Sequence, residues 1–249
     1  RYSDQPAGNY IYTGLSAVKT DDNTGDYIIN RLQNVYLDGV NGSDSNSGND
    51  SSHAVETLEH AMNLVADDGV IYICGTVTVD DELLVDGVTI ERADGFTGQL
   101  ISVYGADARL SLLNTTIDGK KAAGTERTGY LVFVTNGGTL NIGDGTTLTD
   151  NNTTAVYVNN NSFMNMTGGA IQNNTITNPT PDGFYYGGAG ISNGGTTVIS
   201  GGEISGNSVT DYGGGGISNE RGTVTLRGDV VIRDNTATWG GGVATTGAK

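Results

Sequence analysis

The chain has 249 residues, of which 40 are glycine, three are proline and only one, Cys74, is cysteine. One cysteine excludes an intrachain disulfide, and an apolar content of 36% in short β-branched runs excludes a collagen-like or proline-rich disordered polymer. The formal net charge of −16 opposes binding to nucleic acid, and no apolar stretch approaches the roughly 20 residues of a membrane span, so we expect neither partner.

The first 69 residues precede the repetitive part of the chain and divide into two segments. Residues 1–34 are polar with scattered strand-like pieces, and we interpret them as an entry segment. Residues 35–69 begin with a strand and a loop rich in Asn, Asp, Ser and Gly. A helix is predicted over about residues 54–66, because apolar residues recur there at three- and four-residue spacings, namely Val55, Leu58, Ala61, Met62 and Val65.

Oxygen-bearing side chains recur at short spacings in the loop before this helix. Carboxylates and amides are ligands that Ca²⁺ prefers, and the loop supplies Asp38, Asn41, Asp44 and Asn46. The loop lacks the glutamate that closes an EF-hand, and a self-bonded Asx turn uses the same residues without a metal. Ca²⁺ is therefore the one candidate cofactor, with the Asx turn as the alternative.

Residues 70–249 consist of short β-branched runs separated by Gly, Asn and Asp, and they contain a repeat. The sequence Gly-Ile-Ser-Asn occurs twice, and the aliphatic residues Ile191, Ile217 and Val243 are 26 positions apart each time. A constant period with variable loops is typical of a solenoid whose coils stack on one another. New coils are predicted to start near Val70, Leu100, Leu131, Val156, Gly190, Gly216 and Gly242.

A second repeated motif places an aliphatic residue three positions before an asparagine. It occurs at residues 148–151, 171–174, 204–207 and 232–235. An asparagine tolerates the left-handed backbone of a tight corner, and its amide can bond to the equivalent asparagine one coil away. The motif therefore predicts an asparagine ladder in which the asparagines themselves turn the corners.

Within each coil, two or three short strands are predicted to alternate between core and solvent. The inward positions are predicted to include Val77, Val79, Leu140, Ile142, Val198, Val224 and Leu226. The predicted fold is all-β, a right-handed parallel β-helix (solenoid) of about seven coils whose N-terminal edge is capped by the α-helix. We interpret the chain as one domain, because elongated β architectures of this length are often a single cooperative unit. Because the last coil stops at Lys249, we also interpret the chain as a monomeric fragment of a larger protein.

Two groups of residues resemble known families. Gly-Gly-Ala-Gly-Ile at 187–191, with Ile204-Ser205-Gly206-Asn207, resembles the repeats of polymorphic outer-membrane-protein adhesins, with Ile in place of Phe. The segment from Tyr36 through Ala61 is similar to the cap entry of the pectate-lyase-like β-helix superfamily. The resemblance implies a right-handed β-helix, an extracellular location and contact with glycans or host surfaces.

The catalytic motifs of the hydrolases in that superfamily are absent from this sequence, and neither histidine lies among the coils. The last full coil holds Arg227 and Arg233 with Asp229 and Asp234, an arrangement that a lyase could use. Surface ion pairing explains these charges equally well, and a net charge of −16 opposes a polyanionic substrate. No catalytic residue is therefore assigned.

Aromatic side chains are the candidates for carbohydrate binding, because sugar C–H faces stack on rings. Phe184, Tyr185 and Tyr186 lie in a long insert between coils. Tyr212 and Trp239 are 27 positions apart and are predicted to stack on one side of the solenoid. Packing of these rings on glycine corners is the alternative.

These features together favour a non-catalytic bacterial adhesin or binding module, secreted or displayed at the cell surface, whose partner is a glycan or a host-surface protein. Two alternatives remain open. One is a structural stalk within a larger surface protein, and the other is a polysaccharide lyase or glycoside hydrolase of the pectate-lyase-like superfamily.

Overall fold

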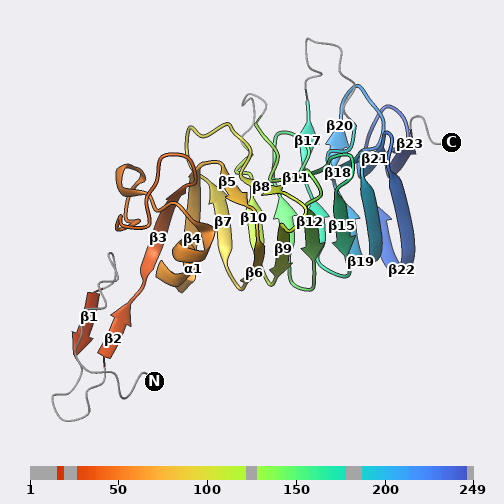
Figure 1. The fold of residues 1–249 in the computed structure, drawn as a ribbon. Coiled ribbons are helices and arrows are strands. Elements are labelled where there is room, and N and C mark those ends of the chain that lie inside the picture. The colour runs from red at the N-terminus through yellow and green to blue at the C-terminus, as the bar shows by residue number, and fades with distance from the viewer. Residues whose placement is uncertain (1–15, 20–26, 122–127, 178–186, 246–249) are drawn as a thin grey trace.

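The computed structural model describes residues 16–19, 27–121, 128–177 and 187–245, with side chains from residue 31 onward. The chain forms a parallel β solenoid with one short N-terminal helix, which confirms the predicted all-β fold (Figure 1). A separate antiparallel pair, β1 (Ser16–Lys19) with β2 (Tyr27–Asn30), precedes it. None of the described helices is long and apolar enough to cross a membrane.

Each coil contributes strands to three sides of the solenoid. The first side is a seven-stranded parallel sheet made of β5 (Val77–Val79), β8 (Ile101–Tyr104), β11 (Val132–Thr135), β14 (Val156–Val158), β18 (Ile191–Asn193), β21 (Ile217–Asn219) and β23 (Val243–Thr245). Ile191 pairs with Ile217 and Ile217 with Val243, so the last coils repeat every 26 residues. Earlier coils differ in length, because Val132 pairs with Val156 and Val156 with Ile191.

The other two sides belong to one twelve-stranded sheet that bends around a corner of each coil. One side holds β6 (Glu82–Asp86), β9 (Arg109–Leu113), β12 (Thr139–Ile142) and β15 (Phe163–Met166). The other holds β3 (Leu32–Asp38), β4 (Val65–Gly75), β7 (Thr89–Arg92), β10 (Thr116–Asp118), β13 (Thr147–Thr149) and β16 (Ala170–Gln172). The long strands β19 (Thr196–Ser205) and β22 (Thr223–Arg233) run along both sides.

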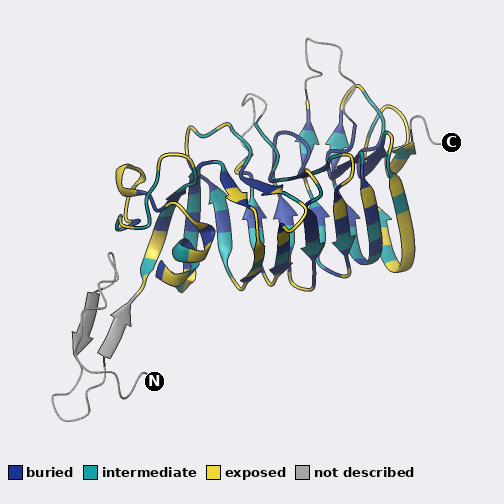
Figure 2. Cartoon of the chain, in the orientation of Figure 1, coloured by how far each residue is buried: buried dark blue, intermediate teal, exposed yellow. Residues whose placement is uncertain are grey.

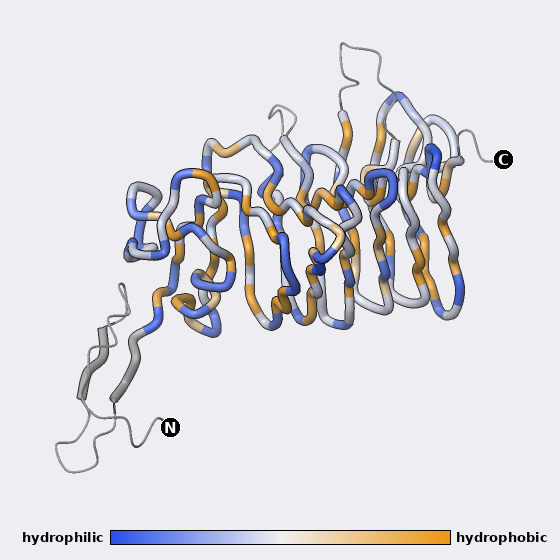
Figure 3. Tube along the Cα trace, viewed as in Figure 1, coloured by the Kyte–Doolittle hydropathy of each residue, from blue (hydrophilic) through white to orange (hydrophobic). Residues whose placement is uncertain are grey.

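A continuous apolar core fills the solenoid. It runs from Val35 at the N-terminal end to Ile217, and its residues come from every second position of the strands (Figures 2 and 3). Equivalent inward residues stack coil upon coil, as in Ile90, Ile117 and Leu148, all fully buried. One coil buries little alone, so each depends on its neighbours for both backbone hydrogen bonds and core contacts.

One predicted inward residue is placed wrongly. Val198 faces outward, aligned with Asn165, while its neighbours Thr197 and Ile199 are buried. A hydroxyl can occupy the interior here because Thr197 Oγ1 donates a hydrogen bond of 2.8 Å to Oδ1 of the buried Asn193. The hydrogen-bonded hydroxyl of Thr197 thus fills an interior position that an aliphatic side chain was predicted to fill.

The N-terminal helix, α1 (Leu58–Leu64), is shorter than predicted. The predicted start at residue 54 is wrong because Val55 pairs with Leu37 as an isolated bridge. A separate 3₁₀ turn, η1 (Ser51–His53), precedes it. The helix begins after Thr57, whose hydroxyl accepts from the backbone N–H of His60, and the chain leaves it directly into β4. The buried residues Leu58, Ala61 and Leu64 pack on the N-terminal end of the core.

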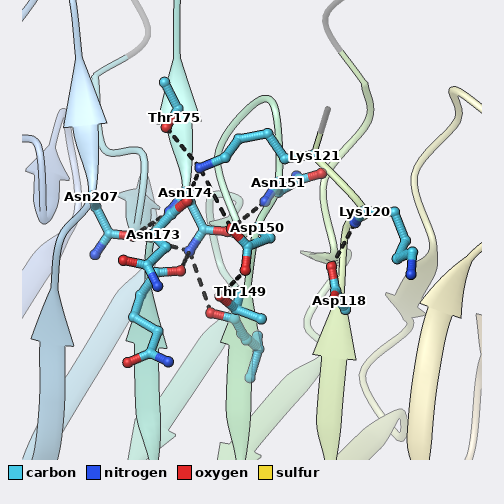
Figure 4. Close-up of polar contacts among 12 residues, drawn as sticks. Asp118, Lys120, Lys121, Thr149, Asp150, Asn151, Asn173, Asn174, Thr175 and Asn207 are labelled. Atoms are coloured by element: carbon cyan, nitrogen blue, oxygen red, sulfur yellow. Dashed lines mark hydrogen bonds and ion pairs between the residues drawn. The ribbon is translucent and has the colours of Figure 1, made fainter. Parts of the chain in front are cut away.

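The predicted asparagine ladder exists and is buried. Asn174 donates from Nδ2 to Oδ1 of Asn207 at 3.0 Å (Figure 4). Asn207 donates likewise to Asn235 at 3.0 Å. The prediction that these asparagines turn the corners is wrong. Positive φ angles occur one residue earlier, at Asp150, Asn173, Gly206 and Asp234, which leaves each following asparagine free to point inward.

Candidate functional site

Tyr212 and Trp239 line one shallow depression near the C-terminal end of the solenoid. Its volume is about 530 Å³, and its other lining residues are Gly187, Gly213, Ser218, Ala244 and Thr245. Trp239 is 64% exposed, the most exposed aromatic side chain among the described residues. The depression therefore offers a ring face to solvent beside two hydroxyl-bearing residues.

Backbone pairing between successive coils positions these two rings. The N–H of Thr238 donates to the carbonyl of Tyr212 at 2.9 Å, and Gly213 forms a parallel bridge with Trp239. The register is thus offset by one residue from the predicted stacking of Tyr212 on Trp239. A Cβ at Gly213 would lie 3.0 Å from the Trp239 carbonyl oxygen, so the absent side chain leaves the depression open.

The three other predicted aromatic residues, Phe184, Tyr185 and Tyr186, lie outside the described residues. A different aromatic cluster lies two coils earlier, where Tyr130, Phe133 and Tyr157 have ring centroids 5.1 to 5.7 Å apart. Sequence reasoning missed this cluster, although the 24-position spacing that pairs Phe133 with Tyr157 matches one coil.

The aromatic cluster and the depression belong to the same outward row of the first sheet. In this row Phe133, Tyr157, Ser192, Ser218 and Ala244 are register partners on successive strands. The two serines between them are buried, so the rings form two separate surfaces and not one continuous track.

A carboxyl group lies near this row on the coil of Ser218. Burial raises the pKa of Glu220, and the nearby Arg221 and the Ser192 hydroxyl lower it by less. Glu220 is therefore a partly buried acid that is more easily protonated than an exposed glutamate.

The loop predicted as a Ca²⁺ site is held by its own hydrogen bonds. Asp38 Oδ1 accepts from the backbone N–H groups of Val40 and Asn41, each at 3.0 Å. Asp44 Oδ1 accepts from the N–H of Glu56 at 2.8 Å, and its Oδ2 accepts from the Thr57 hydroxyl at 2.6 Å. The Asp38 bonds are those of an Asx turn, whereas the Asp44 bonds reach residues 12 and 13 positions further along the chain.

The amide of Asn46 also bonds within this loop, to the carbonyl of Ala54 at 2.9 Å. No group of three or more His, Cys, Asp or Glu side chains in the described ranges is placed to hold a metal ion. The loop thus uses its oxygen and amide groups to fasten the chain to the start of α1.

Arg233 of the last full coil pairs with two acidic side chains. Arg233 contacts Glu203 at 2.7 Å and Asp234 at 2.6 Å. The hydrogen bond to Asp234 and the charge of Glu203 raise the pKa of Arg233 further above its ordinary value. A guanidinium held protonated in this way is poorly suited to act as the base of a lyase.

A pair of carboxylates that sequence reasoning missed lies on the side of the solenoid that contains β7 and β10. Glu91 and Asp118 are register partners on β7 and β10. Burial raises the pKa of Asp118, with smaller contributions from Asp150 and Glu91. The recurrence of Thr-Ile-Glu and Thr-Ile-Asp 27 positions apart, at 89–91 and 116–118, was the available signal.

Two lysines follow Asp118, and both form contacts with neighbouring coils or with the turn itself (Figure 4). Lys120 forms an ion pair of 3.1 Å with Glu91, while its backbone N–H donates to Asp118 at 2.7 Å. Lys121 bonds the hydroxyl of Thr175 at 3.1 Å, the carbonyl of Asn173 and, at 3.6 Å, the carboxylate of Asp150. These contacts tie together the four successive coils that contain β7, β10, β13 and β16.

No family model, curated protein or solved structure matches this chain. The fold and the geometry of the depression define the class as a parallel β solenoid with an exposed aromatic surface.

Proposed function

We propose that this protein is an extracellular bacterial binding module that holds a glycan at the Tyr212–Trp239 depression without chemical change. The observation that supports it is the 64% exposure of Trp239 in a depression that Tyr212 also lines. An exposed indole presents a flat apolar face and one N–H donor, which suits the alternating C–H faces and hydroxyls of a sugar ring.

The surroundings of the depression favour a neutral glycan. Ser218 and Thr245 supply hydroxyls at its wall, and no lysine or arginine lines it. With a net charge of −16, the long-range field repels polyanions. A neutral oligosaccharide avoids that repulsion.

A second candidate function, glycoside hydrolysis, is favoured by the Glu91–Asp118 pair. Glycosidases use two carboxyl groups in this way: one with a raised pKa acts as the general acid, and the other, ionised, acts as nucleophile or base. Glu91 forms an ion pair of 3.1 Å with Lys120, and burial raises the pKa of Asp118 above its ordinary value. The stalk alternative predicts neither binding nor hydrolysis.

The test is binding of the purified chain to an array of neutral and acidic glycans, while the wash is assayed for released oligosaccharide. Retention without release supports the binding module, and Trp239→Ala should remove that retention. Phe163→Ala is the matched control, because Phe163 is an exposed ring on β15, away from the depression.

Three other outcomes would contradict the proposal. Release of oligosaccharide that stops in Asp118→Asn would establish the hydrolase. Neither retention nor release would favour the stalk. Retention that survives Trp239→Ala would place the binding site elsewhere on the solenoid.

A further inference from the structure

The residues that line the depression recur from coil to coil. Gly187, Gly213 and Trp239 are 26 positions apart, and so are Ser218 and Ala244. These two rows come from three successive coils, whose strands β18, β21 and β23 lie side by side in the first sheet (Figure 1). The depression therefore extends along the axis of the solenoid, across these coils.

Backbone pairing keeps the first of these rows straight. Gly213 forms a parallel bridge with Trp239. One coil earlier, the N–H of Gly188 donates to the carbonyl of Gly214 at 2.7 Å. Equivalent residues thus lie directly beside one another on successive coils. Because neighbouring strands lie about 4.8 Å apart, the row spans roughly 10 Å over the three coils.

Two glycines keep the floor of the depression open. A Cβ at Gly187 would collide with the carbonyl oxygen of Gly213 and would lie 3.0 Å from the Ser218 hydroxyl. A Cβ at Gly213 would lie 3.0 Å from the Cβ of Ala244 and 3.7 Å from the Cβ of Trp239. Each added carbon would occupy space between residues that line the depression. The glycines therefore leave room for a ligand that passes from one coil to the next.

The lining of the depression suits a chain of neutral sugar rings. Tyr212 and Trp239 supply aromatic rings, Ser218 and Thr245 supply hydroxyls, and none of the described lining residues carries a charge. Sugars present C–H faces to aromatic rings and hydroxyls to polar side chains. A chain that runs straight along the axis contacts such groups on each coil, whereas a chain that curves leaves the row.

We propose that the depression binds an unbranched glycan with cellulose-type β linkages, whose chain lies along the solenoid axis. Such linkages make successive rings follow one another in a straight ribbon, whereas amylose-type α linkages wind the chain into a helix. A straight ribbon can follow the row from Gly187 past Gly213 to Trp239, and a length of roughly 10 Å holds about two rings. This inference rests on the proposed function, because it names the class of glycan held at the same site.

Isothermal titration calorimetry of the 249-residue chain with oligosaccharides of increasing length tests the inference. The probes are the monomers to tetramers of four series with cellulose-type linkages, built from glucose, N-acetylglucosamine, mannose or xylose. In at least one series the affinity should rise by about tenfold or more from monomer to dimer and level off from the trimer onward. Maltotetraose, the α-linked isomer of cellotetraose, is the matched ligand control and should bind no more tightly than glucose.

The variant Gly213→Ala tests the path of the chain. Its Cβ narrows the middle of the row, so the affinity for the tetramer should fall by about tenfold or more. Gly194→Ala is the matched control, because Gly194 lies outside the depression and its added Cβ would make an ordinary contact of 3.4 Å with the Val158 carbonyl oxygen. Circular dichroism checks that both variants fold, and the length series decides if Gly213→Ala does not.

Several results would overturn this inference while leaving the binding module intact. They are equal affinity for the monomer and the tetramer, maltotetraose bound as tightly as cellotetraose, and full affinity in a folded Gly213→Ala variant. Failure of all four series to bind a chain that retains some other glycan would overturn it as well. A chain that retains no glycan, or that retains it after Trp239→Ala, would instead contradict the proposed function itself.

Discussion

Arg92 donates a hydrogen bond from Nη2 to Oδ1 of Asn151 at 3.1 Å, joining two coils across 59 positions of the chain. The guanidinium is 4% exposed and also bonds the carbonyl oxygens of Gly98, Gly119 and Gly129. Burial lowers the pKa of Arg92 to about 10, still above physiological pH, so the group stays charged. Arg92 thus closes the N-terminal end of the asparagine ladder with a cation bonded to neutral acceptors.

Replacement of Arg92 should destabilise the fold strongly. Arg92→Met keeps an apolar stem but removes four hydrogen bonds, and it leaves the carbonyls of Gly98 and Gly119 without this donor. We expect a loss of about 3 kcal/mol or more in the free energy of unfolding. Urea unfolding followed by circular dichroism measures it. Arg109→Met is the control, because Arg109 is exposed, and an equal loss in the two variants would contradict the role of Arg92.

The asparagine ladder should contribute through its buried amides. Asn174 is fully buried, and its Nδ2 donates to the carbonyl of Gln172 at 2.9 Å as well as to Asn207. Asn174→Ala should lower the free energy of unfolding by about 2–3 kcal/mol, because it creates a cavity and leaves buried acceptors unpaired. Asn160→Ala, at an exposed turn position, should change it by less than about 0.5 kcal/mol.

The loop at Asp44 should make stability depend on pH in the acid range. Burial raises the pKa of Asp44, but hydrogen bonds from Thr57 and Glu56 together lower it by more. The pKa of Asp44 therefore lies below its ordinary value of 3.8. The stabilisation is therefore present above pH 3.8 and is lost as the pH falls through the folded pKa.

The variant Asp44→Ala tests this dependence. It should be less stable than the unaltered chain by about 1–2 kcal/mol at pH 7, and the difference should shrink as the pH falls below 3.8. Urea titrations at several pH values measure both. A difference that persists at the lowest pH would show that the carboxylate charge is not its source.

Removal of Ca²⁺ should leave the fold unchanged. The carboxylates of Asp38 and Asp44 already accept backbone N–H groups, so the loop keeps its shape without a metal. The thermal midpoint in chelator should equal that in about 1 mM Ca²⁺, a concentration typical of extracellular Ca²⁺ modules. A midpoint that rises with Ca²⁺ in the unaltered chain, and not in Asp38→Asn, would instead establish a metal site at this loop.

Loss of the Trp239 ring should affect binding and not stability. Because the side chain is 64% exposed, Trp239→Ala removes little buried surface, and the thermal midpoint should stay within about 1 °C. Affinity for a glycan retained by the unaltered chain should fall by about tenfold or more. Isothermal titration calorimetry measures the affinity, and a large fall in the midpoint would show that the ring acts in packing.

Local repetition alone was enough to predict the solenoid. The equal spacing of Ile191, Ile217 and Val243 predicts that these residues stack on successive coils, and they do pair in register. The aliphatic-x-x-Asn motif predicts the ladder for the same reason. These signals lie within one or two coils, where sequence distance and spatial distance are simply related.

Tertiary structure decided what depends on contacts across several coils. Arg92 meets Asn151 only because two intervening loops return to one corner, and Thr197 is buried only because Asn193 satisfies its hydroxyl. Glu91 and Asp118 become neighbours through strand register, and Gly213 lies against the Trp239 backbone through pairing of successive coils. A repeat in the sequence determines which residues are equivalent, but burial and hydrogen bonding depend on what the loops bring against them.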